Sequence, residues 1–185
     1  VVDREAPFYF TKSPTTLVMA EGEIAYAPRT ENYHYEMELV FALKSGGTNI
    51  AEADALSHIY GCAAGLDMTR RDLQNKAKEN RKPWDTAKDV DESAVITPLR
   101  QMAEVPSVAS GRIHLSQNST VKQDADLSEM VWSVPEIIAD LSTMYTLQQG
   151  DVIYMGTPAG VGAVSRGDVL AGGVEGIGDF ELKII

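Results

Sequence analysis

The segment His34-Tyr35-Glu36-Met37-Glu38-Leu39-Val40-Phe41-Ala42-Leu43 is the most informative part of the sequence, because an alternating pattern is followed by an uninterrupted apolar run. Alternation with a period of two, followed by β-branched and aromatic side chains, predicts a β-strand that becomes buried along its length. Similar short runs predict strands at 110–115, 152–155 and 180–185. Turn sequences such as Gln149-Gly150-Asp151 recur between them, which indicates a sheet-rich body with tight connections.

Helical patterns predict three helices, at 52–60, 69–81 and 135–145. Pro135 suits a first helical turn, and apolar residues recur after it at helical spacing. Three helices are too few for each strand to be followed by a crossover helix. The pattern therefore favours an α+β fold over a doubly wound parallel sheet.

Composition limits the class of protein. A chain of 185 residues with 44% apolar residues is expected to form a single domain over 1–185. Its net charge of −11 argues against a nucleic-acid partner, and no stretch approaches the roughly 18 apolar residues that span a bilayer. The one cysteine, Cys62, lies among glycine and alanine and is predicted to be a buried structural thiol. We expect a soluble cytoplasmic protein.

Two glutamates mark the start of the predicted strand. Glu36 and Glu38 are two residues apart, so their side chains emerge on one face about 7 Å apart. Like charges that close repel, and either one carboxylate takes up a proton or a hard divalent cation keeps both ionised. The alternative is an ordinary solvated acidic face, and these residues alone leave both interpretations open.

A third acid lies in the sequence Gly65-Leu66-Asp67-Met68-Thr69-Arg70-Arg71-Asp72-Leu73-Gln74. Asp67 is predicted to lie near a helix N-cap, and its spacing of four and three to Arg71 and Gln74 places all three along one helix face. A carboxylate for a cation, beside a guanidinium and an amide, suits an anionic oxygen-rich ligand. The alternative is a surface ion pair worth a few tenths of a kcal/mol.

These motifs together resemble the fumarylacetoacetate hydrolase family, in its C-terminal catalytic domain. The pieces fall in the family's order over nearly the whole chain: His-x-Glu-x-Glu at 34–38, Gly-Leu-Asp-Met-Thr-Arg-Arg-Asp-Leu-Gln at 65–74, Pro-Trp-Asp-Thr-Ala-Lys at 83–88, Met-Val-Trp at 130–132 with Pro-Glu at 135–136, and Gly-Asp at 150–151 leading into Gly-Thr-Pro-Ala-Gly-Val-Gly at 156–162. The resemblance implies a β-rich roll or barrel of mixed sheets with a few short helices.

The resemblance also implies a set of site residues. The family's metal ligands fall on Glu36, Glu38 and Asp67, with Mg²⁺ or Mn²⁺ as the usual ion. The active-site lysine falls on Lys88, near Trp84, which is expected to desolvate it. Residues that contact the pyruvyl part of the substrate fall on Arg71 and Gln74, and a residue that binds substrate through its hydroxyl and backbone falls on Thr157. His34 is expected to support the metal shell, whereas His58 and His114 carry no motif and are expected to be structural or exposed.

The activity implied is metal-dependent hydrolysis of a C–C bond in a small 2-oxo acid. The branch of the family that this sequence resembles most acts on 2,4-dioxo acids, fumarylpyruvate or another acylpyruvate, in aromatic compound degradation. Family members are commonly homodimers. They activate the water with a His and Glu pair in an upstream lid segment, which we expect the sequence in hand to lack. Lys12-Ser13-Pro14 also departs mildly from a common Lys-Pro.

Three alternatives use the same acids. Oxaloacetate decarboxylation needs only a metal chelate and a cation beside the enolate. Isomerisation of a 2-hydroxy-diene-dioate needs a proton shuttle. A non-catalytic domain with a structural metal ion requires nothing of Lys88, Arg71 or Thr157.

Overall fold

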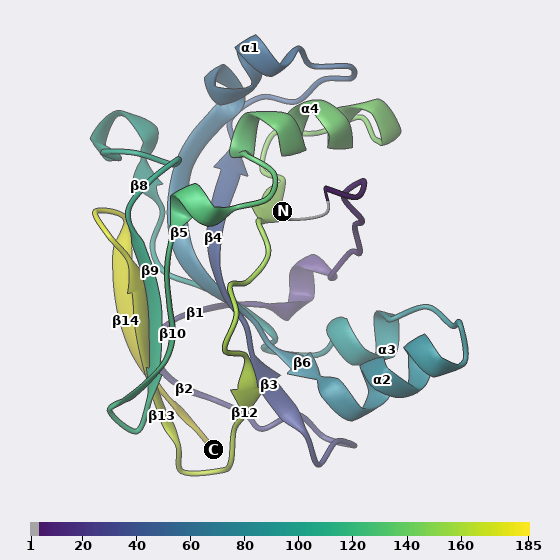
Figure 1. The fold of residues 1–185 in the computed structure, drawn as a ribbon, viewed down its shortest axis with the longest axis vertical. Helices are drawn as coiled ribbons and strands as arrows, with labels where there is room; N and C mark the ends of the chain where they lie inside the picture. The colour runs from purple at the N-terminus through teal and green to yellow at the C-terminus, as the bar shows by residue number, and fades with distance from the viewer. Residues whose placement is uncertain (1–3) are drawn as a thin grey trace.

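The computed structural model describes residues 4–185, and in this part of the chain three β-sheets are accompanied by short helices (Figure 1). The first sheet has the order β1 (Leu17–Met19), β7 (Ala94–Ile96), β5 (Ile59–Asp67), β4 (Met37–Leu43) and β11 (Val152–Tyr154), and β8 (Arg100–Gln101) also pairs with β5. The second has the order β10 (Thr120–Asp126), β9 (Arg112–Gln117), β13 (Val169–Val174), β14 (Gly178–Ile184) and β2 (Gly22–Ile24). The third has the order β12 (Gly162–Ala163), β3 (Tyr33–Tyr35) and β6 (Thr69–Arg70).

The first two sheets are mixed, because β1 with β7 and β2 with β14 are parallel pairs whereas the other pairings are antiparallel. The predicted α+β class, with mixed sheets and a few short helices, is confirmed. Over residues 4–185 the sheets stay open and do not close into a barrel. The predicted strands are also found, as β4, β9, β11 and β14, with ends shifted by up to two residues.

The α-helices are α1 (Glu52–Ala55), α2 (Arg71–Glu79), α3 (Asp85–Lys88) and α4 (Val134–Met144). Single 3-10 turns lie at Pro14–Thr16, Leu56–His58, Met102–Glu104 and Leu127–Glu129. Figure 1 shows α1 and α4 together at one end of the sheets, while α2 and α3 form a pair that projects from the side. The segment before β1 runs from α4 past this pair. None of the helices in the described part of the chain is long and apolar enough to cross a membrane.

Two of the helix predictions need correction. The predicted helix at 52–60 is only α1 and one 3-10 turn, because Ile59 already enters β5. The predicted helix at 69–81 begins at Arg71, since Thr69 and Arg70 pair with β3 as β6. The helix predicted at 135–145 is confirmed as α4, whose capping box joins Ser133 and Glu136.

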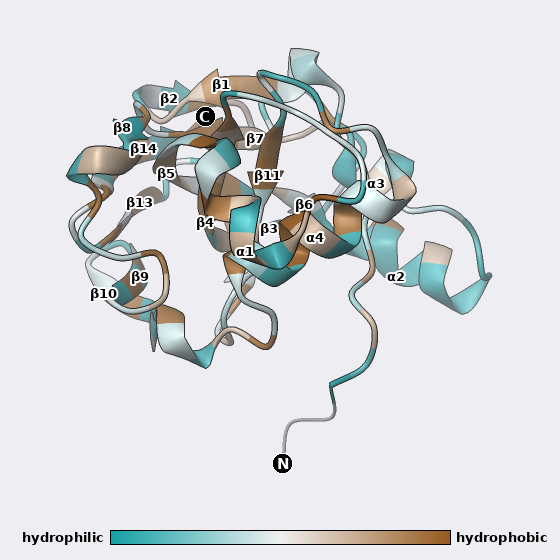
Figure 2. Cartoon of the chain, turned by 90° about the horizontal axis from the view of Figure 1, so that it is seen from above, coloured by the Kyte–Doolittle hydropathy of each residue, from teal (hydrophilic) through white to brown (hydrophobic). Residues whose placement is uncertain are grey.

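The core centres on the antiparallel pair β4 and β5. Every residue of β4 is buried, and so is every residue of β5 except Tyr60. Figure 2 shows apolar colour over β4 and β7 and hydrophilic colour over α2. Cys62 of β5 is fully buried, as predicted, and burial raises the pKa of its thiol to about 11. Small residues along β5 let the neighbouring strands and side chains approach closely.

Gly65 of β5 shows how little space remains there. A Cβ added at this position would lie 2.6 Å from the side chain of Val40 and 2.7 Å from the carbonyl oxygen of Val95. We expect Gly65→Ala to lower the free energy of unfolding by about 1–3 kcal/mol, because the backbone oxygen cannot move aside cheaply. Urea unfolding of the two proteins measures this loss, and an unchanged midpoint would contradict the packing described.

Candidate metal centre and active site

The three predicted acids meet where β4 and β5 lie side by side. Glu36 precedes β4, Glu38 is its second residue, and Asp67 is the last residue of β5. The Asp67 amide donates a hydrogen bond of 2.9 Å to the Glu36 carbonyl, which holds the two strand ends together. All three side chains are buried, and one carboxylate oxygen from each lies within 4.8 Å of the others. The predicted cluster is therefore present in the structure.

Asp67 does not lie at a helix N-cap, contrary to the prediction. It continues the pairing of β5 with Ala94 of β7, and α2 begins four residues later with Arg70 as its N-cap. Asp67, Arg71 and Gln74 thus do not share a helix face. They converge because β6 turns the chain from β5 into α2.

Lys88 contacts two of the three acids, Glu36 and Asp67. Its Nζ donates to Glu36 Oε2 at 2.6 Å, to Asp67 Oδ2 at 2.5 Å and to Thr69 Oγ1 at 2.7 Å. Only 2% of the residue is exposed. The aromatic ring over its ammonium is that of Phe10, with the ring centroid 4.8 Å from Nζ.

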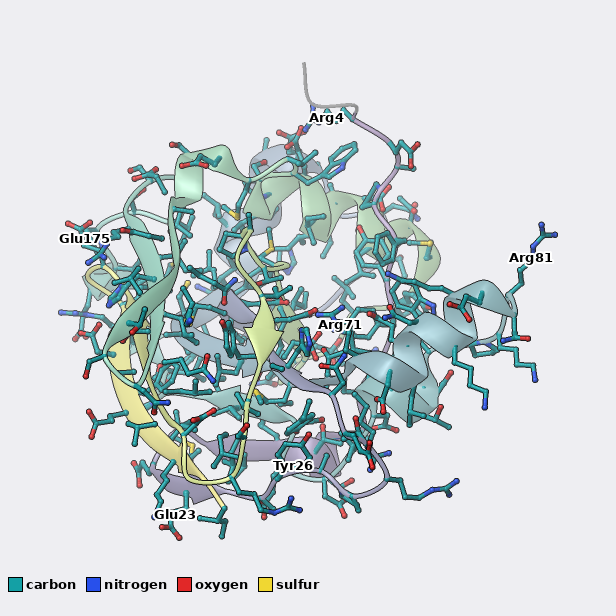
Figure 3. The ribbon with its side chains drawn as sticks, turned by 60° about the horizontal axis from the view of Figure 1, so that its bottom comes forward. Arg4, Glu23, Tyr26, Arg71, Arg81 and Glu175 are labelled. Carbon is teal, nitrogen blue, oxygen red and sulfur yellow. The ribbon has the colours of Figure 1, made fainter. Side chains whose placement is uncertain are left out.

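Two further cations contact the carboxylates. Arg71 pairs with Glu36 and donates to Gln74 Oε1 at 2.5 Å, so the predicted Arg71 and Gln74 are neighbours of the cluster. Figure 3 shows Arg71 pointing into the middle of the molecule, whereas Arg81 at the end of the same helical pair points outward. Lys12, which the sequence prediction missed, is 2.6 Å from Asp67 Oδ1 and also donates to the carbonyls of Met68 and Ser93.

The three acids differ in how their charge is compensated. Burial raises the pKa of Asp67, but Lys12 and Lys88 outweigh burial and the net shift is downward. Glu38 receives only a backbone N–H, from Gly156 at 2.7 Å. Burial, and then the charges of Asp67 and Glu36, raise the pKa of Glu38 well above its ordinary value. Glu38 is therefore the carboxylate whose negative charge a further cation would stabilise most.

Thr157 lies in the loop after β11, where Gln123 fixes it. Gln123 Nε2 donates to Thr157 Oγ1 at 2.8 Å and to the Pro158 carbonyl at 2.9 Å. Its Oε1 accepts from the Met37 amide at 3.0 Å, so one fully buried side chain ties this loop to the start of β4. The sequence prediction missed Gln123, because it lies in a polar strand that contains no motif indicating a functional residue. A register shift in β10 lies directly before it and re-aims its side chain.

The histidines lie outside the carboxylate cluster. His34 Nε2 pairs with Asn32 Oδ1 at 2.8 Å rather than with an acid. Burial, together with the charge of Arg71, lowers the pKa of His34 to about 4, so the ring is neutral near pH 7. His58 pairs with Ser45, as suits a structural role.

The chain belongs to the fumarylacetoacetate hydrolase family. The model of the family's C-terminal domain matches residues 1–185. The fumarylpyruvate hydrolase of a Ralstonia species is 53% identical over 180 residues, which cover 97% of this chain and 93% of the relative. The human mitochondrial oxaloacetate tautomerase FAHD1 is 33% identical over 179 residues, which cover 96% and 80%.

Solved structures give the same family. A crystal structure of fumarylpyruvate hydrolase from Pseudomonas aeruginosa, in complex with Mn²⁺ and pyruvate, superposes with a TM-score of 0.96 at 40% identity and covers 98% of this chain and 80% of that one. A 5-carboxymethyl-2-hydroxymuconate delta-isomerase from Mycobacterium smegmatis superposes with a TM-score of 0.92 at 27% identity, covering 100% and 71%. The fold is thus shared by relatives with different reactions.

We expect Mn²⁺ to bind more tightly as the pH is raised through the range above 4.5, the ordinary Glu value. The reason is that the raised pKa of Glu38 favours its protonated form in the metal-free protein, and metal binding competes with that proton. Isothermal titration calorimetry in two buffers of different ionisation enthalpy measures both affinity and proton release.

The matched variant for this test is Glu38→Gln, which carries no proton to release. It is expected to bind Mn²⁺ more weakly and with a flatter pH dependence. Equal pH dependence in both proteins would contradict the assignment to Glu38.

Replacing Gln123 by leucine is expected to cost about 1–3 kcal/mol of folding stability, because the buried Met37 amide loses its acceptor. Gln123→Glu keeps that acceptor and removes the donors to Thr157 and Pro158. Thermal unfolding should therefore rank wild type first, Gln123→Glu second and Gln123→Leu last. Equal stability of all three would show that the loop is held by other contacts.

Proposed function

We propose that this protein is a metal-dependent hydrolase that cleaves a C–C bond in a 2,4-dioxo acid, fumarylpyruvate or another acylpyruvate, to give pyruvate and a carboxylic acid. The observation that carries the proposal is the buried group of Glu36, Glu38 and Asp67 with Lys88 and Arg71 directed into it. The Ralstonia fumarylpyruvate hydrolase, at 53% identity, supports this reaction over others of the family.

The carboxylates fit a hard divalent cation, Mg²⁺ or Mn²⁺. They offer oxygen atoms from three side chains within 4.8 Å, and Glu38 has no basic side chain paired with it among residues 4–185. Glu36, Glu38 and Asp67 would hold the ion, with water or substrate oxygens in the remaining positions. When bound, the ion would supply Lewis-acid polarisation of the substrate's oxygens.

Substrate orientation is assigned to residues around the cluster. Arg71 and Gln74 on α2 present a guanidinium and an amide, which suit the carboxylate and 2-oxo group of the pyruvyl end. Thr157, held by Gln123, offers a hydroxyl from the opposite loop. Contacts on both sides would hold the substrate in one orientation for the reaction.

Hydrolysis places charge where Lys88 can stabilise it. A water molecule adds through its oxygen to the distal carbonyl carbon, C4, and loses one proton, and the C3–C4 bond then breaks to release the acyl part as the carboxylic acid. The electron pair of this bond remains on the pyruvyl part as an enolate, which takes up a proton to give pyruvate. The Lys88 ammonium, buried among the carboxylates, is placed to stabilise the developing negative charge.

We also propose a cytoplasmic homodimer that acts in aromatic compound degradation. Leu17 and Met19 lie on β1, an edge strand of the first sheet, and each is 42% exposed. Exposed apolar side chains along a sheet edge are typical of a contact between subunits. The buried free thiol of Cys62 suits a reducing compartment.

A second candidate reaction is isomerisation or tautomerisation of a 2-oxo diacid. The human FAHD1 relative and the M. smegmatis isomerase structure favour it, since both share the fold. Decarboxylation of oxaloacetate would use the same acids. These reactions need no water attack on a distal carbonyl, so their products differ from those of hydrolysis.

A substrate panel separates the candidates. Fumarylpyruvate, acetylpyruvate and oxaloacetate are each incubated with the protein and Mg²⁺ or Mn²⁺, while enol absorbance and pyruvate release are followed. We expect fumarylpyruvate to yield pyruvate and fumarate. Turnover of oxaloacetate alone would contradict the hydrolase proposal.

Lys88→Gln is expected to lower kcat for fumarylpyruvate by about 10²–10³-fold, because it removes a cation from the developing charge. Arg71→Lys keeps the charge but loses the planar fork, and is expected mainly to raise KM. Lys44→Gln, an exposed change just past β4, serves as the control. Unchanged turnover in both site variants, with Mn²⁺ still bound, would favour a structural metal-binding domain.

A further inference from the structure

A hollow of about 400 Å³ lies beside the candidate centre, and the proposed function gives it no role. Its walls come from the segment before β1, from the loop that leads into α3, and from Tyr145 just after α4. Figure 1 shows these three parts of the chain around one side of the molecule. Lys88 also lines the hollow, so the space leads from the surface to the residue that contacts Glu36 and Asp67.

Aromatic rings form the walls. The Phe8 and Trp84 rings meet edge to face with centroids 5.4 Å apart, and Phe10 lies 6.2 Å from Trp84. Phe8 is nevertheless 71% exposed and Phe10 is 40% exposed. A group of exposed aromatic side chains around a concave site is typical of ligand-binding surfaces. Flat faces of this kind suit a planar, unsaturated chain.

The segment that contributes Lys82 and Lys88 to the hollow is basic, although the protein is acidic. Residues 70–88 contain seven of the 16 basic residues and three of the 27 acidic ones, in a chain of net charge −11. Lys82 lines the hollow together with Asp85, and the Lys78 Nζ lies 4.7 Å from the centre of the Trp84 ring. Within residues 4–185 the Lys82 ammonium has no carboxylate partner. It is thus available to an anionic group of a ligand.

We propose that this hollow is the subsite for the acyl end of the substrate, and that Lys82 pairs with a carboxylate at the far end of that acyl chain. The inference rests on the proposed function and deepens it. Lys88 lies at the end of the hollow near the bond that breaks. The rings of Phe8, Phe10 and Trp84 contact the conjugated chain. Lys82 forms an ion pair with the carboxylate at the end of that chain. The substrates favoured are therefore acylpyruvates whose acyl group is an unsaturated chain ending in a carboxylate.

The test compares Lys82→Gln with wild type on two substrates. Fumarylpyruvate has a distal carboxylate, and acetylpyruvate has none. We expect kcat/KM for fumarylpyruvate to fall by about fivefold, because an ion pair open to solvent is weak. Turnover of acetylpyruvate should stay unchanged. Lys76→Gln, an exposed charge change on α2 outside the hollow, should affect neither substrate.

A substrate esterified at the fumaryl carboxylate tests whether Lys82 pairs with that carboxylate. Wild type and Lys82→Gln should hydrolyse this monomethyl ester at equal rates, because the group that Lys82 pairs with is neutral. Equal losses on fumarylpyruvate and acetylpyruvate, or no loss on either, would overturn the subsite. A loss in Lys76→Gln as large as in Lys82→Gln would also overturn it, in favour of a general electrostatic effect.

Failure of the hydrolase proposal would look different. Wild type would then release no pyruvate from any of these compounds. The subsite would still be judged by calorimetric dissociation constants, measured with Mg²⁺ present. Fumarylpyruvate should bind less tightly to Lys82→Gln than to wild type, with acetylpyruvate unchanged, and equal binding of fumarylpyruvate to both proteins would overturn it.

Discussion

Repulsion among three buried carboxylates is the constraint on which the rest of the site depends. Glu36, Glu38 and Asp67 are held within 4.8 Å of one another, where each charge would destabilise the folded chain if left alone. Lys12 and Lys88 reach the cluster from separate segments and offset part of that cost. The compensation is uneven, because Glu38 receives only a backbone amide, and this leaves Glu38 open to a further cation.

The sheet supplies the rigidity that such a cluster needs. β4 and β5 are buried except at Tyr60 and pair from Met37 to Leu43, so the acids cannot separate without disrupting the core. Small residues on β5, Gly65 above all, allow Val40 and Val95 to pack against the strand. The loop of Thr157 is tied to this frame by Gln123, which joins it to Met37, and by the Gly156 amide, which donates to Glu38.

Sequence reasoning found the residues that carry a pattern and missed those that act through tertiary contact. Glu36 and Glu38 were visible because a strand period places them on one face, and the family motifs then gave Asp67 and Lys88. The strand β5 was not predicted, because its glycines and alanines have low β propensity and are fixed by packing instead. Lys12 is 55 residues from its partner Asp67 in the sequence, and Gln123 is 86 residues from its partner Met37. No local sequence pattern predicts contacts over such separations.

The central claim, that Glu36, Glu38 and Asp67 hold a divalent cation, is tested most directly by crystals of the protein grown with Mn²⁺. Anomalous difference maps at the manganese edge locate the ion without assumptions about its ligands. We expect one manganese peak per chain, bounded by an oxygen from each of the three carboxylates and absent from crystals of Asp67→Asn. A peak elsewhere, or no peak while the three acids stay paired only with Lys12, Arg71 and Lys88, would contradict it.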